Sequence, residues 1–199
     1  MDERLRQLAA QARILGLMHD QSLSPTIRSI LRQADAKARL LSDDELGTIC
    51  SASNVNAENL QRLQSKTPQI VTSAKSQLLR EDPGLVLPGG ALYPEPRAEA
   101  CWRDCWHFLR VTIYAVAAGR PVFTHPPGVK GLRDLYLELG VPISSMAQAV
   151  GFLKADAISD YTSYASPSDT SLLGDALLHL EQMIQQLNQR SSSGAEVLL

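Results

Sequence analysis

A thiol, a carboxylate and two guanidinium groups fall within two turns of one predicted helix between residues 97 and 119. Cys101 and Asp104 are three residues apart, so a helix places them one turn apart and leaning together. Arg97 shares the general side of Cys101, and Arg103 lies one step around from it. A thiol can form a thioether to a ligand carbon, a carboxylate accepts hydrogen bonds from ligand N–H groups, and arginines bind carboxylates in forked pairs.

The same segment is rich in flat apolar side chains, which favour a large conjugated ligand. They are Trp102, Trp106, Phe108 and Tyr114. A linear tetrapyrrole would use the whole set, with its ring N–H groups on Asp104 and its two propionates on the arginines. A cysteine that faces the protein core, beside an outward Arg/Asp salt bridge, explains the same residues. The spacing alone leaves both interpretations open.

Three other kinds of site fit these residues less well. A zinc site made by Cys101, Cys105 and His107 lacks the second pair of ligands that zinc motifs carry. A haem needs an axial ligand, and His107 and His125 are poor candidates for that role. A catalytic cysteine needs a histidine in a recognisable partner motif. We therefore expect neither a metal site nor an enzyme.

Helical patterns dominate the part of the chain that precedes these residues. An amphipathic period covers residues 2–18, and a second helix is expected after Ser24-Pro25, a cap followed by a proline at the first helical position. A capping box at residues 42–45 predicts the start of a third helix. Thr67-Pro68 repeats the cap-then-proline signal and predicts a further start.

Turn-forming residues at 82–96 then interrupt the helical pattern. The helix that carries Cys101 is expected to begin near Pro96 and to run to Ala118, with Gly119 as its C-terminal stop. Further helices are expected from near residues 130, 143 and 169. With no convincing strand and no internal repeat, the sequence predicts an all-α domain of roughly seven to nine helices.

Composition excludes several functional classes. The 199 residues fit one compact domain, and 44% of them are hydrophobic, as is ordinary for a globular protein. Lys and Arg total 19 against 21 Asp and Glu, so a formal net charge of -2 gives no broad field to attract nucleic acid. No segment approaches the ~20 apolar residues of a membrane-spanning helix, and the N-terminus does not read as a secretory signal. Three cysteines favour a reducing compartment over a disulfide framework.

Four runs of residues occur in the order and at the spacing of a known family. They are Ala34-Asp35-Ala36-Lys37-Ala38-Arg39-Leu40-Leu41-Ser42; Leu87-Pro88-Gly89-Gly90 with Tyr93; Cys101, Arg103, Asp104, Phe108, Leu109, Arg110, Thr112, Tyr114, Ala118 and Gly119; and Gly131-Leu132-Arg133, Tyr136 and Leu139-Gly140-Val141-Pro142. These runs resemble the phycobiliprotein family, allophycocyanin and phycocyanin subunits in particular, and the resemblance covers roughly residues 25–160. The chain looks like a divergent member.

The resemblance implies a globin-like all-α domain at residues 25–190. It would follow an N-terminal helical extension at 1–24 and precede a disordered tail at 191–199. The implied function is that of a light-harvesting or energy-transfer subunit of a phycobilisome-type antenna, cytoplasmic and peripheral to the cytoplasmic face of the thylakoid membrane. The alternative is a phycobiliprotein-like scaffold or assembly factor that binds a photosynthetic partner without a permanent pigment.

Carried over residue by residue, the resemblance also implies a pigment site. Cys101 matches the cysteine that binds a linear tetrapyrrole (a phycocyanobilin-type bilin) covalently, and Asp104 matches the aspartate that bonds the central pyrrole nitrogens. Arg103 and Arg97 match basic residues near the propionates. Trp102 and Tyr114 complete the expected cofactor-binding set.

The resemblance implies a protein partner through two further residues. Asp35 and Arg110 match an acid–base pair that joins two different subunits in the family, and a partly buried pair of this kind fixes register. We therefore expect a second phycobiliprotein-like subunit, in a hetero- or homodimer or a higher ring. Linker or photosystem proteins are further candidate partners.

The sequence departs from the family in several places. Arg120 stands where the family has an aspartate, Leu40 replaces a tyrosine of the partner-facing motif, and residues 1–20 precede the family's first helix. The part after Tyr161 departs most. These differences indicate a specialised relative and not a bulk antenna subunit.

Overall fold

The computed structural model of the chain describes residues 3–187, to which all structural statements below refer. Over these residues the fold is all-α, as the sequence predicts. It consists of α1 (Glu3–Gln11), η1 (Leu17–His19), α2 (Pro25–Ala36), α3 (Asp43–Ser53), α4 (Ala57–Glu81), η2 (Pro83–Val86), α5 (Glu95–Ala117), α6 (Pro126–Leu139), α7 (Ile143–Thr162) and α8 (Pro167–Leu187), where η marks short 3-10 helices. The predicted tail at 191–199 lies outside the described residues.

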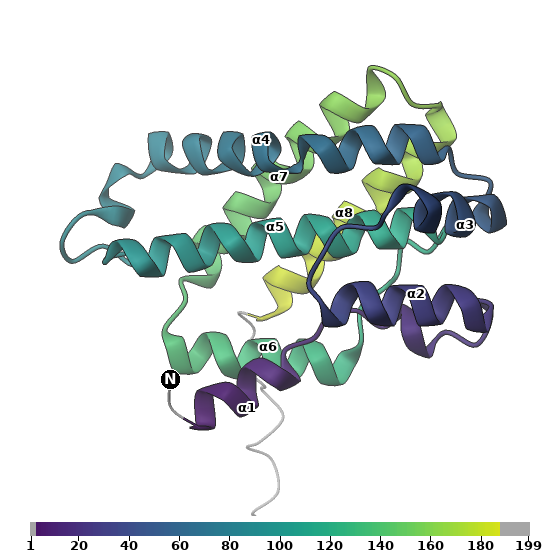
Figure 1. Cartoon of the computed structure of the whole chain (residues 1–199). Helices are drawn as coiled ribbons and strands as arrows, with labels where there is room; N and C mark the ends of the chain where they lie inside the picture. The colour runs from purple at the N-terminus through teal and green to yellow at the C-terminus, as the bar shows by residue number, and fades with distance from the viewer. Residues whose placement is uncertain (1–2, 188–199) are drawn as a thin grey trace, which may run out of the picture.

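The long helix α5 lies at the centre of the molecule (Figure 1). α4 runs beside it, α7 packs against α4 and α8, and α8 contacts α5 from behind. Every residue of α5 from 108 to 117 is buried, including the fully enclosed Tyr114. A helix that is buried all round must belong to the core, so α5 is a fixed platform for the side chains it carries.

Several predicted helix ends are confirmed. The Ser24 hydroxyl accepts from the Ile27 amide at the start of α2, and Ser42 with Glu45 forms the full capping box of α3. α5 ends at Ala117, and Gly119 adopts a φ of 66° directly after it, a left-handed conformation that glycine takes without a steric penalty.

Two predicted boundaries are wrong. Thr67-Pro68 does not begin a helix, because α4 runs unbroken through both residues, and the buried Thr67 hydroxyl donates to the Leu63 carbonyl oxygen. Within the amphipathic pattern of residues 2–18, the α-helix ends at Gln11, and the short 3-10 helix η1 follows at Leu17–His19. The backbone between them is not helical, because Leu15 forms a β-bridge with Thr124 on a loop distant in the sequence. Tertiary pairing overrides the local helical period here.

Residues 3–23, hereafter the N-terminal segment, pack against α6 and the loop before it. The Gly16 amide donates to the Phe123 carbonyl at 2.7 Å, and the His125 amide donates to the Ile14 carbonyl at 2.7 Å. Ile14, Leu15, Leu17 and Leu23 are buried in the common core. The expected extension at 1–24 is therefore part of the folded body over its described residues.

Arg120, the charge that departs from the family pattern, belongs to this contact. Its Nε is 3.1 Å from Asp20 Oδ2, and its Nη2 donates to the Ser22 hydroxyl at 3.0 Å. Asp20 and Ser22 are in the N-terminal segment, so the unusual arginine and the additional residues complement each other. None of the helices in the described part of the chain combines the length and apolar character needed to cross a membrane.

Candidate functional site

The Cys101 thiol lies on α5 in a tight apolar environment. The residue is 6% exposed and lines a small pocket that has no room for a water molecule. The rest of this pocket is formed by residues of α4, the loop after η2, α5 and α7, namely Leu78, Leu92, Trp102, Ser145, Met146 and Ala149. Burial raises the pKa of the thiol to about 12, with the nearby Asp104 charge acting in the same direction. At neutral pH the group is therefore a protonated thiol of low reactivity.

Trp102 and Cys105 flank the same region. The Trp102 side chain has a buried Nε1 without a hydrogen-bond partner, and the Lys75 ammonium lies 5.5 Å from the ring centroid. Cys105 Sγ is 3.8 Å from Met146 Sδ, and burial raises the pKa of its thiol as well. All three cysteines of the chain are free, so Cys101 is not committed to a disulfide.

Asp104 is held by a tyrosine from a different helix. Tyr136, on α6 and 1% exposed, donates its hydroxyl to Asp104 Oδ2 at 2.9 Å. Burial raises the pKa of Asp104, while the Tyr136 hydrogen bond and the Arg103 charge oppose that shift. Burial and the facing carboxylate raise the pKa of Tyr136 well above its usual value. In the sequence, Tyr136 is visible only as the tyrosine of the motif that begins at Gly131. That position is the signal by which its role beside Asp104 could have been predicted.

Asp104 opens onto a groove of about 360 Å³, which we call the Asp104 groove. Arg103 and His107 of α5 line it beside Asp104, and the buried His107 Nδ1 has no hydrogen-bond partner. Burial lowers the pKa of His107, and the positive charges of Arg110 and Arg103 add to the effect. Residues of α2, α6 and the N-terminal segment form the other walls.

Cys101 is one helical turn from Asp104 but does not line the Asp104 groove. A step of three residues rotates a helix by about 300°, which leaves the two side chains about 60° apart around the axis. The structure thus places the predicted thiol and carboxylate on the same stretch of α5, facing two neighbouring pockets. Arg103 is the predicted basic residue that does share the groove with Asp104.

Arg97 binds the protein's own backbone. Its guanidinium donates to the carbonyl oxygens of Leu139 and Gly140, where α6 ends. Gly140 caps that end in a left-handed conformation with a φ of 62°. In the described structure, Arg97 therefore ties the start of α5 to the end of α6 and does not line the Asp104 groove.

Asp35 and Arg110, expected to join two subunits, form their pair within one chain. Arg110 Nη2 donates to Asp35 Oδ1 at 2.9 Å, and Arg110 Nη1 donates to the Tyr114 hydroxyl at 2.9 Å. Tyr114 in turn donates to the Arg39 carbonyl oxygen. The charges therefore fasten α2 and the α2–α3 connection to α5. This differs from the inter-subunit role that the resemblance implies, because both partners of the ion pair belong to the same chain.

Tyr114 has a structural position in this network. It is completely buried, burial raises its pKa, and it does not line the Asp104 groove. Arg39 also forms a double hydrogen bond to Glu45, with both nitrogen–oxygen distances at 2.6 Å. Of the predicted cofactor-binding residues, Asp104 and Arg103 lie together, Cys101 and Trp102 share the adjacent pocket, and Arg97 and Tyr114 have other partners.

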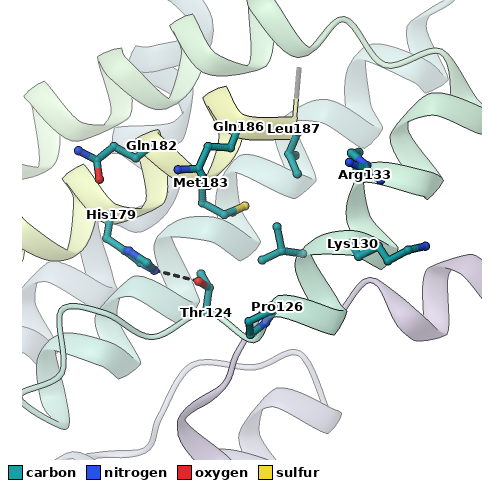
Figure 2. A pocket seen from close by; sticks show the side chains of 10 residues that line it. Thr124, Pro126, Lys130, Arg133, His179, Gln182, Met183, Gln186 and Leu187 are labelled. Carbon is teal, nitrogen blue, oxygen red and sulfur yellow. Dashed lines mark hydrogen bonds between the residues drawn. The ribbon is translucent and has the colours of Figure 1, made fainter. Parts of the chain in front are cut away.

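A second cavity, of about 480 Å³, lies between the start of α6 and α8 (Figure 2). His179 points from α8 toward Thr124, and its Nε2 is 2.9 Å from the Thr124 hydroxyl. Burial lowers the pKa of His179. Lys130 and Arg133 stand on the α6 side. None of the predicted cofactor-binding residues lines this cavity, so the candidate site is the region of α5 around Cys101 and Asp104.

Comparison with known proteins shows which family the chain resembles. The sequence signature described as Phycobilisome protein matches residues 29–189. The C-phycocyanin beta subunit of Arthrospira platensis is 35% identical over 153 residues, which cover 74% of this chain and 89% of that protein. The R-phycoerythrin beta chain of Pyropia yezoensis is 34% identical over 140 residues, 69% of this chain and 79% of that protein. The R-phycocyanin beta subunit of Synechococcus sp. (strain WH7803) is 36% identical over 133 residues, 65% and 77% of the two chains.

Proposed function

The chain belongs to the phycobilisome protein family, and we propose that it is a bilin-carrying light-harvesting or energy-transfer subunit with its pigment on α5. The family has a globin-like all-α fold, and its phycocyanin and phycoerythrin beta subunits are pigment proteins and not enzymes. Those subunits carry bilins linked to cysteine. The observation that carries the proposal to this chain is the position of Cys101 one turn before Asp104, beside a groove that Asp104 and Arg103 share.

The Asp104 groove offers the groups that a linear tetrapyrrole requires. A carboxylate accepts hydrogen bonds from pyrrole N–H groups, and a guanidinium binds a propionate. The volume of about 360 Å³ lies within the range of roughly 300–1,000 Å³ that is typical of ligand sites. Asp104 and Arg103 therefore fit the polar part of the pigment, and the buried, unpartnered His107 Nδ1 leaves one further polar atom for it.

When bound, a bilin supplies absorption of visible light and transfer of the excitation energy. The protein's part is to hold the pigment extended and rigid. Asp104 is suited to this task because Tyr136 fixes its carboxylate from α6, and because α5 is packed into the core on all sides along residues 108–117. A carboxylate that cannot rotate gives a bound ring system one defined orientation.

Cys101 would hold the pigment through a thioether, made by addition of its S–H across an exocyclic double bond of the pigment. Such an addition would make a C–S bond and pass the thiol proton to a pigment carbon, with nothing oxidised and no leaving group. The Cys101 pocket has no room even for a water molecule, and the thiol is protonated at neutral pH. We therefore expect attachment to require local opening of the side chains around Cys101.

The mass of the native protein tests the proposal. Protein coexpressed with bilin biosynthesis should gain the mass of one tetrapyrrole and show a zinc-fluorescent band after denaturing electrophoresis. Cys101→Ser should abolish both signals. Cys105→Ser is the matched control, because Cys105 is a neighbouring buried thiol that is hydrogen-bonded to Met146. This variant should keep both signals. If Cys101→Ser keeps both signals, Cys101 is not the attachment site. If the unaltered protein gains no mass, the pigment function is refuted.

One observation favours a second candidate function, an unpigmented scaffold or assembly factor. The protein's own side chains enclose the Cys101 thiol, and Arg97 is bonded to the end of α6. A chain with this arrangement folds without needing a pigment to fill the pocket. The same mass measurement separates the two functions, because the scaffold should remain colourless when bilin is abundant.

The partner and location follow from the family in outline. Phycobiliprotein subunits pair with alpha partners in oligomers, and the family attaches to the thylakoid surface. For this chain we propose a second phycobilisome-type subunit as the partner and the cytoplasmic face of the membrane as the location. Exposed apolar side chains outside the core, including Leu87, Tyr93 and Leu139, offer contact surface for a partner.

A further inference from the structure

The N-terminal segment approaches α6 more closely than side chains normally allow. A Cβ atom at Gly128 would stand 1.8 Å from the Arg13 carbonyl oxygen, and one at Gly131 would stand 2.5 Å from the Gln11 carbonyl oxygen. Only glycine fits at either position while the segment is docked. Two glycines on one face of α6 therefore hold the backbone of residues 11–13 at a fixed distance from that helix.

This docking makes the N-terminal segment one wall of the Asp104 groove. The segment contributes Ala9, Ala12 and Arg13 to the lining, followed by the buried Ile14 and Leu15. On the α5 side the lining includes Arg103, Asp104 and His107. Any ligand held by Asp104 in this groove therefore also meets residues that precede the part of the chain matched by the family signature.

The charges in the groove are unbalanced. Arg13 and Arg103 both line it, and within residues 3–187 neither side chain makes a hydrogen bond or an ion pair. Asp104 is already bonded to Tyr136, and Asp35 is bonded to Arg110. Two guanidinium groups, one from the N-terminal segment and one from α5, thus line the groove without an ion pair, although the Arg103 charge acts on the neighbouring Asp104. A ligand with two carboxylates complements them, and its N–H groups complement Asp104.

We propose that the N-terminal segment forms part of the pigment site and that Arg13 binds one carboxylate of the pigment. The inference rests on the proposed function and deepens it, since it assigns a pigment contact to residues outside the family's own domain. Arg103 binds the other carboxylate from the opposite wall. Gly128 and Gly131 keep the segment, and with it Arg13, close enough to α6 to close the groove.

The carboxylate contact is tested with two free probes, biliverdin and its dimethyl ester, in which methylation removes the negative charge of both propionates. Binding to the unpigmented protein is followed by fluorescence quenching. Arg13→Gln should weaken biliverdin binding about tenfold or more, the usual effect of losing a charge-assisted hydrogen bond, and should leave the ester unchanged. Arg6→Gln is the matched control, because Arg6 is on the same segment but pairs with Glu3 in solvent. It should change neither affinity.

Hydrogen exchange provides a readout that does not depend on colour. Biliverdin should slow amide exchange in residues 3–23 of the unaltered protein. Gly128→Val, which wedges the segment away from α6 without touching a charged group, should speed that exchange and weaken biliverdin binding. The inference is overturned if Arg13→Gln binds biliverdin as tightly as the unaltered protein does. It is also overturned if biliverdin does not change the rate of amide exchange in residues 3–23.

The result separates this inference from the proposed function. If pigment still attaches to Cys101 with an unchanged spectrum and biliverdin affinity in Arg13→Gln, the function stands and the role of Arg13 is wrong. If no mass is added to Cys101 and neither probe binds, both fail. Weaker binding of the diacid alone, together with protection of residues 3–23, supports the inference even where covalent attachment is absent.

Discussion

Replacing Asp35 with asparagine tests the buried charge pair between α2 and α5. Arg110 Nη2 is 2.9 Å from Asp35 Oδ1, and the two side chains are only 6% and 7% exposed. Asparagine keeps the shape of aspartate and one acceptor oxygen, but it removes the negative charge that balances the guanidinium. The variant therefore leaves a buried cation without its counter-ion.

The structure allows the size of the effect to be estimated. Removing one partner of a buried ion pair costs about 3–5 kcal/mol. Because asparagine and the Tyr114 hydroxyl still accept hydrogen bonds from Arg110, we expect Asp35→Asn to lose about 3 kcal/mol of unfolding free energy. This lowers the folding equilibrium constant about 150-fold. Asp35→Ala, which leaves Arg110 Nη2 without an acceptor, should cost about 4–5 kcal/mol.

Urea unfolding followed by far-ultraviolet circular dichroism measures the loss, and protein concentration tells which chains form the pair. A pair made within one chain gives the same loss over about a hundredfold range of concentration. A pair made between chains gives a loss that appears as weaker association. Asp134→Asn is the control, because its pairs with Lys130 and Arg133 lie at the surface and should together be worth no more than about 1 kcal/mol.

Two results would refute the reasoning. A loss below about 1 kcal/mol for Asp35→Asn would show that the pair is not buried in solution. A loss that appears only as dissociation of an oligomer would show that α2 packs on another subunit, as the resemblance to the family implies. In that case the contact between α2 and α5 within one chain would be wrong.

Three further predictions concern ionisable groups. Cys101, with a pKa of about 12 against an ordinary 9.0, should react with iodoacetamide at about pH 8 roughly a thousandfold more slowly than a free thiol, and denaturant should restore the rate; fast native alkylation would contradict its burial. Tyr136→Phe removes a hydrogen bond that stabilises the Asp104 carboxylate, so the pKa of Asp104 should rise further and the fold should lose about 1 kcal/mol; an NMR titration that shows no rise would exclude the bond. The pKa of Glu45 is lowered from 4.5 to about 2, chiefly by the Arg39 hydrogen bonds. The stabilising contribution of Glu45 is therefore complete above pH 4.5 and disappears as the pH falls through about 2. In urea unfolding, Glu45→Gln should be less stable than the unaltered protein at neutral pH and should lack this acid-dependent loss.

Local sequence signals were enough to predict the helix ends that carry a full capping motif. The capping box of Ser42 and Glu45 and the glycine stop at Gly119 were visible in the sequence, because each depends on residues a few positions apart. Thr67-Pro68 carried a similar local signal, yet it lies inside α4. There the burial of α4 against α7 outweighs the hydrogen bond that proline removes.

The candidate site was predicted in part. The motif order pointed to Cys101, Asp104 and Arg103 on one helix, and the structure places all three there. The sequence did not show that Arg97 would bind the end of α6, or that the Cys101 thiol would face a different pocket from Asp104. Each of these depends on where a second helix lies.

The sequence by itself determined which residues are helical on α5, which of them bear chemistry, and to which family the motifs belong. Helix periodicity and capping are set within a few residues, so they can be read from the chain. Only the tertiary structure decided that Asp35 pairs with Arg110 of the same chain, and that Arg13 lines the same groove as Arg103. Such contacts join residues tens of positions apart, and their formation depends on the balance between burial, desolvation and close backbone approach that is settled when all the helices pack together.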